Sequence, residues 1–161
     1  MLDGAARIGP LIQEAVKQGM PAVAVTDHGN TFAAFEFYKT AKDAGIKPII
    51  GIEAYVTPGT HRSDKTRVRW GGPEQNRDDV SGSGAYTHMT LLSESTEGMH
   101  NLFRLSSLAS MEGYYFKPRM DREILQKYSK GLIATSGCPS GEIQTRRRLG
   151  QYDAARAAAA E

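Results

Sequence analysis

Apolar residues recur every three or four positions over 8–16 and again over 31–44, which predicts two amphipathic helices. Between them, residues 22–26 form a short continuous apolar run that contains two valines. Residues 47–56 form a second run, in which alternate positions are apolar on both faces. Short apolar runs rich in β-branched residues are typical of strands buried in a parallel sheet. The first third of the chain therefore predicts helix, strand, helix and strand.

The second half of the chain continues this alternation. It predicts strands over 86–92 and 131–135, and helices over 97–110, 121–128, 142–149 and 152–161. Asp121 stands where the helix over 121–128 needs an N-cap. Strands that alternate with helices predict an α/β fold with a largely parallel sheet.

The segment 58–85 interrupts the pattern, because its only large apolar residues are two valines and one tryptophan. A connection of this length without an obvious element is usually functional or mobile. Four of its basic residues, Arg62, Lys65, Arg67 and Arg69, form a run that precedes Trp70. Cations beside an aromatic ring suit phosphate contact and base stacking. A solvated polar loop explains the same residues, and the nearby Asp78 and Asp79 favour that interpretation.

Charge and composition exclude several classes of protein. The 161 residues are about one domain in length, and 20 Lys and Arg against 18 Asp and Glu give a net charge of only +2. This balance excludes a strongly basic nucleic-acid coat but not a local basic patch. No apolar run approaches the roughly 20 residues that span a bilayer. With one cysteine and no visible signal peptide, we expect a cytoplasmic protein without an internal disulfide.

Side chains that bind metals stand at or near the end of each predicted strand. They are His28, Glu53, His88 and Cys138. Ligands gather at the carboxyl ends of strands in parallel α/β folds, and imidazole, carboxylate and thiolate are common donors to zinc and similar ions. Each residue also has an ordinary interpretation, such as a hydrogen-bonded core histidine or a small buried cysteine. Glu53 is the exception, because a carboxylate among isoleucines is costly to bury unless it is paired or bound to a cation.

Other polar residues near these positions remain open to two interpretations. Asp27 precedes His28 and either orients that imidazole or holds the turn of the loop. His61 and His100 are expected to be ordinary surface residues, since one lies in the polar loop and the other on a helix. The sequence holds no phosphate-cradling Gly-rich loop and no Ser/His/Asp hydrolase signature.

Several long blocks closely resemble one family, the PHP (polymerase and histidinol phosphatase) domain at the N-terminus of bacterial replicative DNA polymerase III α subunits. The blocks, in chain order, are MLDGA (1–5), TDHGN (26–30), KPIIGIEAY (47–55), HMTLL (88–92) and TSGCPSGE (135–142). The loop around Trp70 and Asp78 is similar to the actinobacterial version in particular.

This resemblance implies a distorted (β/α)7 barrel with a centre of up to three divalent metal ions, which are zinc, manganese or iron. The matching ligands are Asp3, His28, Glu53, His88 and Cys138. The family's H-x-H and D-x-H ligand pairs have no counterpart in this sequence. We therefore expect a partial barrel that lacks its first and last strands. The expected organisation is a single partial PHP domain over 1–161, with a polar insertion loop at about 58–85.

The resemblance also implies a function, namely chromosomal DNA replication as a fragment of the polymerase catalytic subunit. The PHP domain of the intact protein would be a metal-dependent 3′→5′ exonuclease, with Asp3, Glu53 and His88 as catalytic residues. Partners would be primer–template DNA, the remaining polymerase domains and replisome subunits such as the sliding clamp, with no membrane. The isolated fragment is expected to be inactive and poorly soluble. One alternative is a non-catalytic, metal-stabilised docking domain, and another is a stand-alone phosphoesterase of the histidinol phosphatase type.

Overall fold

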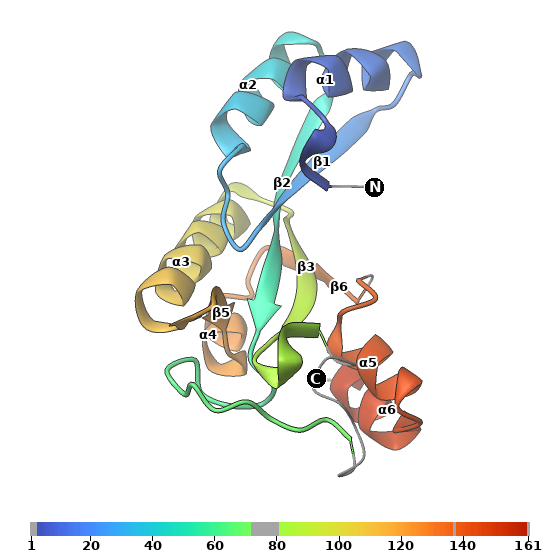
Figure 1. Cartoon of the computed structure of the whole chain (residues 1–161). Coiled ribbons are helices and arrows are strands. Elements are labelled where there is room, and N and C mark those ends of the chain that lie inside the picture. Colours follow the sequence, from blue (N-terminus) through green and yellow to red (C-terminus); the bar gives the residue numbers. More distant parts are fainter. Residues whose placement is uncertain (1–2, 72–80, 137, 161) are drawn as a thin grey trace.

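The computed structural model describes residues 3–71, 81–136 and 138–160 (Figure 1). The α-helices are α1 (Ile8–Lys17), α2 (Ala34–Asp43), α3 (Thr96–Glu112), α4 (Arg122–Lys127), α5 (Glu142–Arg148) and α6 (Tyr152–Ala160). The strands are β1 (Ala22–His28), β2 (Lys47–Val56), β3 (Thr87–Ser93), β4 (Tyr114–Tyr115), β5 (Lys117–Met120) and β6 (Leu132–Thr135). Two 3-10 helices, η1 (Asp3–Ala5) and η3 (Ser81–Gly84), complete the described elements. The predicted alternation of helices and strands is confirmed.

The ten-residue strand β2 is the centre of one mixed sheet. The strand order is β4-β5-β2-β3-β6, and β1 also pairs with β2. Strand β3 lies along one edge of β2, while β1 and β5 share the opposite edge. On that shared edge β1 ends beside Glu53, and β5 pairs with the last two residues of β2. The end of β1 and the start of β5 therefore meet beside the last part of β2, near Glu53 and Tyr55.

The expectation of a largely parallel sheet is wrong for β3, which runs antiparallel to both β2 and β6. A parallel connection needs a crossover that packs on the sheet face, usually as a helix. The polar segment between β2 and β3 has too few apolar side chains to pack there. The chain therefore returns from the end at which β2 finishes, and β3 runs back along it.

Strands β4 and β5 are a hairpin that the sequence pattern did not predict. They contain two and four residues, and Pro118 removes one donor from the ladder. Between them Phe116 turns the chain with a φ of 60°, a conformation that is uncommon for a bulky residue. Short length, a proline and a turn without glycine together leave no recognisable hairpin signal.

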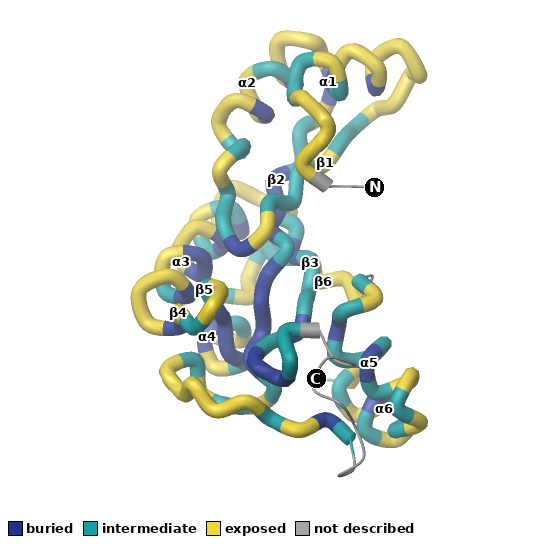
Figure 2. Tube along the Cα trace, in the orientation of Figure 1, coloured by how far each residue is buried: buried dark blue, intermediate teal, exposed yellow. Residues whose placement is uncertain are grey.

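The hydrophobic core includes Ile50, Ile52, Ala54 and Val56, which alternate along β2 and therefore share one of its faces. Figure 2 shows much of β2 as buried. Side chains of α3, including Leu102 and Leu105, complete this core from the covering helix. Strand alternation sends Glu53 and Tyr55 to the opposite face. Among the described residues, no helix is both long enough and apolar enough to cross a bilayer.

Arg119 anchors the polar segment that follows β2. Its guanidinium is fully buried and donates to the carbonyls of Gly113, Ala85, Arg62 and Asp64 over 2.8–3.3 Å. Burial lowers the pKa of Arg119 and the Asp64 carboxylate partly offsets this. A buried cation is tolerated here because carbonyl oxygens meet its donors.

Asp121 holds the same segment from the other side. Its carboxylate accepts from the backbone N–H of Arg62 at 2.9 Å and from the Arg62 guanidinium at 3.0 Å. It also caps α4 by accepting from the backbone N–H of Ile124 at 3.1 Å, which confirms the predicted N-cap. Arg62 reaches Glu112 and Glu123 as well, at 2.6 and 3.2 Å. These bonds form a latch between the loop and α4, which we call the Arg62 latch.

Candidate metal centre

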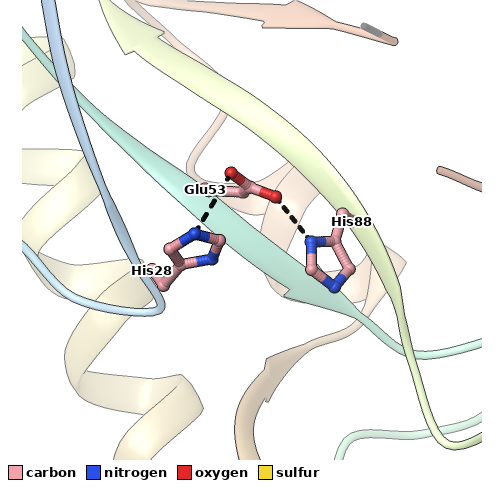
Figure 3. Close-up of side chains that lie close together, drawn as sticks. All are labelled: His28, Glu53 and His88. Atoms are coloured by element: carbon pink, nitrogen blue, oxygen red, sulfur yellow. Dashed lines mark hydrogen bonds and ion pairs between the residues drawn. The ribbon is translucent and has the colours of Figure 1, made fainter. Parts of the chain in front are cut away.

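His28, Glu53 and His88 converge on the face of the sheet opposite the core (Figure 3). One Glu53 oxygen lies 2.5 Å from His88 Nδ1, and the other lies 3.7 Å from His28 Nε2. One ligand atom from each residue lies within 4.8 Å of the other two. The Glu53 and His88 side chains are 18% and 15% exposed, whereas His28 is 40% exposed. The group is therefore largely enclosed but open on the His28 side.

The sheet register explains why these residues meet. His28 is the last residue of β1 and pairs directly with Glu53. On the other edge of β2, His88 pairs with Tyr55, two residues from Glu53 and so on the same face. Because β3 runs in the reverse direction, its beginning lies near the end at which β1 and β2 finish. The reversed strand thus brings His88 to the same part of the sheet as His28.

Cys138, which follows β6, lies close to this group without belonging to the compact set of three. Burial raises the pKa of the Cys138 thiol, and the neighbouring Glu53 carboxylate raises it further. Hydrogen bonding with Ser140 acts in the opposite direction. The predicted ligand is therefore a protonated thiol beside Glu53 at neutral pH, and a cation would favour its thiolate.

The remaining candidate, Asp3, begins η1, but its side chain lies outside the described part of the structure. Its role as a ligand stays a prediction. Asp27 has a clear structural partner, because its carboxylate accepts from the backbone N–H of Ala33 at 2.7 Å. That bond supports the loop-turn interpretation of Asp27.

Two tyrosines, which the sequence analysis did not single out, pack against the group. The Tyr55 ring lies edge-on to the His88 ring at 5.1 Å between centroids, and to Tyr86 at 4.9 Å. Burial raises the pKa of Tyr55, and the nearby Tyr86 and Glu53 add to this effect. The available signal was strand alternation, which puts Tyr55 on the same face as Glu53. The two rings wall one side of the group.

A second group of possible ligands, His61, Asp121 and Glu123, lies at the Arg62 latch. Here the Arg62 guanidinium already bonds the Asp121 and Glu123 carboxylates at 3.0 and 3.2 Å. A fixed positive charge at these oxygens opposes a second cation. The arrangement is therefore an ion-pair network that holds the loop.

The structure corrects one interpretation of the basic loop. Trp70 is only 7% exposed, and the Arg146 guanidinium covers its ring at 4.7 Å from the centroid. The Trp70 ring is therefore not available for stacking on a nucleic-acid base. Arg62 is likewise engaged in the latch and does not face solvent as a free cation.

The donor set at His28, Glu53 and His88 fits a divalent transition metal. Two imidazoles and one carboxylate direct lone pairs toward a shared space, with a thiol nearby. Such mixed nitrogen, oxygen and sulfur donors suit zinc, manganese and iron. A largely enclosed carboxylate also needs a positive partner, and a bound cation would supply it to Glu53.

Comparisons with known proteins identify the family of the chain. The family model described as "PHP domain" matches residues 1–161. The chain is 58% identical to the DNA polymerase III subunit alpha of Saccharopolyspora erythraea and 57% identical to that of Mycobacterium tuberculosis, over its full length. It is 43% identical to the subunit of Aquifex aeolicus over 88% of its length. The chain spans about 14% of the length of the first two relatives and 12% of the third. By its sequence and by the family model that covers it, this chain belongs to the PHP domain family.

Proposed function

We propose that the chain is the PHP segment of a DNA polymerase III α subunit, which replicates the chromosome in the cytoplasm. In that intact protein the segment would contribute to a metal-dependent 3′→5′ exonuclease that removes mispaired nucleotides. The supporting observation is the convergence of His28, Glu53 and His88, with Cys138 beside Glu53. The names of the relatives support the polymerase context. Partners would be primer–template DNA, the remaining polymerase domains and replisome subunits such as the sliding clamp.

The proposed whole is a distorted (β/α)7 barrel, to which this mixed sheet would contribute several strands. Asp3 would add a carboxylate to the centre, and further ligands would come from outside this chain. The centre would hold up to three ions of zinc, manganese or iron. Catalytic roles fall to Asp3, Glu53 and His88, with His28 and Cys138 as further ligands.

The chemistry would be hydrolysis of a phosphodiester at the 3′ end of a strand. Divalent ions would supply two effects there: they would lower the pKa of a bound water, and they would neutralise negative charge on the phosphate oxygens. The two Glu53 oxygens each lie near a different imidazole and would help to position His28 and His88. Tyr55 and Tyr86 would shield one side of the site from bulk water. The more open His28 side would admit the substrate.

The test is Glu53→Ala in the intact polymerase, with a primer whose 3′ nucleotide is mismatched. The proposal predicts loss of 3′→5′ hydrolysis, while nucleotide incorporation on a matched primer continues. Glu36→Ala, which alters an exposed carboxylate on α2, is the matched control and should hydrolyse like the wild type. Unchanged hydrolysis in Glu53→Ala would refute the role of Glu53.

A structural role is the second candidate, and one observation favours it. The three converging residues come from three adjacent strands, so a cation would cross-link β1, β2 and β3. Metal binding of this kind contributes directly to folding free energy. Bound metal in a wild-type polymerase that lacks any 3′→5′ hydrolysis would favour this docking or stabilising role.

A further inference from the structure

The hairpin formed by β4 and β5 presents aromatic rings to solvent beside the candidate metal centre. Tyr114 and Phe116 are 61% and 58% exposed. The Phe116 ring contacts the Tyr115 ring within the hairpin, at 4.5 Å between centroids, and the Arg67 guanidinium from the polar loop. A flat, accessible aromatic face of this kind is what an unpaired base stacks on.

Phe116 holds this position in a strained backbone conformation. Its φ of 60° lies in the left-handed region, which bulky residues rarely adopt. Such strain persists where the surroundings enforce it and clusters at ligand-binding sites. A glycine would satisfy the backbone here without strain. The turn therefore carries a large, exposed side chain at a position where the backbone conformation disfavours one.

One cation lies over the Phe116 ring, and a second follows Phe116 in the chain and lies over Tyr55. The Arg67 guanidinium lies 5.0 Å from the centre of the Phe116 ring, and the Lys117 ammonium lies 5.6 Å from the centre of the Tyr55 ring. Within the described ranges, neither has a carboxylate at ion-pair distance. Both side chains are exposed, so both are able to meet the phosphates of a strand whose base lies on Phe116.

The hairpin adjoins the metal centre directly. Strands β1 and β5 lie on the same edge of β2, so Gly29, next to His28, meets Pro118. A Cβ added to Gly29 would lie 2.8 Å from both Pro118 and the Tyr55 ring. Lys117 reaches over Tyr55, and Tyr55 contacts His88. Tyr55 thus connects the hairpin to the centre.

We propose that this hairpin binds the unpaired 3′ end of a DNA strand next to the metal centre. A base stacks on Phe116, and the adjoining phosphates contact Arg67 and Lys117. The surface favours single strands over duplex, because a paired base offers no free face to the ring. The assignment of the strand as a substrate rests on the proposed exonuclease function, whereas the binding surface is testable without hydrolysis.

The first experiment is photo-cross-linking in the intact polymerase, with EDTA present to prevent hydrolysis. The probe is a primer–template whose mismatched 3′ nucleotide is 5-iododeoxyuridine. Cross-links are expected on the tryptic peptide 105–119, because the bond between Lys117 and Pro118 resists trypsin. In Phe116→Gly, which suits the positive φ and should fold, the yield on this peptide should fall about tenfold. If no cross-link forms on this peptide, or if Phe116→Gly gives the same yield as the wild type, the proposed binding surface is overturned.

The second experiment measures hydrolysis of the mismatched primer. Phe116→Gly and Lys117→Ala should each raise KM about tenfold, since base stacking and phosphate contacts are both lost from binding. The controls are Tyr152→Ala, with a ring that is 68% exposed on α6, and Lys47→Ala at the far end of β2. Both controls should keep the wild-type KM. A wild-type KM in both hairpin variants would contradict the inference. A wild-type enzyme that does not hydrolyse the primer would contradict the proposed function, and the cross-linking experiment would then decide whether the hairpin binds DNA.

Discussion

The Arg62 latch gives a prediction that depends on a single carboxylate. Asp121 is 3% exposed and accepts three hydrogen bonds, two from Arg62 and one from Ile124. The change Asp121→Ala removes all three at once. It frees the backbone of Arg62 from α4 and leaves that helix without its N-cap.

The expected cost follows from these contacts. Loss of an N-cap costs about 1 kcal/mol. Removing one partner of a buried ion pair costs about 3–5 kcal/mol. Arg62 keeps Glu112 and Glu123, so we take about 2 kcal/mol for that loss, below the usual range. The sum is about 3 kcal/mol, which corresponds to a change of about 100-fold in the population of the opened latch.

Limited trypsin digestion of the intact protein measures this opening. The Arg62 side chain is 12% exposed, so cleavage after it requires the latch to open. The cleavage rate follows the open population when closing is fast. Asp121→Ala should therefore raise the rate after Arg62 about 100-fold. Glu123→Ala is the matched control, because its 64% exposed carboxylate should change the rate only a few-fold. An unchanged rate in Asp121→Ala would refute the latch.

Three further predictions concern Asp121, Arg119 and Gly29. Burial opposes ionisation of Asp121, but bonds from Arg62 and Ile124 outweigh it and lower the pKa, so stability from this group is present above the ordinary carboxyl pKa. That stability should be lost as the pH falls through the lowered value, seen as smaller amide-exchange protection factors at Arg62 and Ile124 relative to the intrinsic rate at each pH, and constant protection factors would contradict it. Arg119→Met should lower the urea midpoint by the equivalent of about 3 kcal/mol, because it leaves four carbonyls without their buried donor; an unchanged midpoint would show that water replaces it. Gly29→Ala should raise KM for the mismatched primer, because the backbone φ is 68° and the added Cβ would lie 2.8 Å from Pro118 and Tyr55 and push the hairpin away. A wild-type KM would contradict the proposed link between the hairpin and primer binding.

The sequence predicted the site more fully than it predicted the sheet. Glu53 stood out because a carboxylate among isoleucines needs a partner, and the structure gives it His28 and His88. The pattern predicts parallel strands, whereas His88 reaches the group on an antiparallel strand. The direction of a strand depends on how the segment before it packs, and the spacing of apolar residues does not determine that packing.

The sequence pattern could not predict the hairpin. Phe116 adopts a positive φ without being glycine, and Pro118 weakens the strand signal. The sequence singled out Trp70 as a ring that could stack on a base, but the Trp70 ring is buried under Arg146. Phe116, which the sequence did not single out, is the ring that is exposed. Exposure of an aromatic ring is decided by tertiary packing, which local sequence does not specify.

The most direct test of the metal centre compares the intact wild-type polymerase with His88→Ala. Elemental analysis and hydrolysis of a primer with a mismatched 3′ end are measured on the same preparations. His100→Ala, which alters an exposed histidine on α3, is the control and should match the wild type in both. The account predicts that His88→Ala loses both metal and hydrolysis while polymerisation continues. Wild-type metal content together with wild-type hydrolysis in His88→Ala would contradict it.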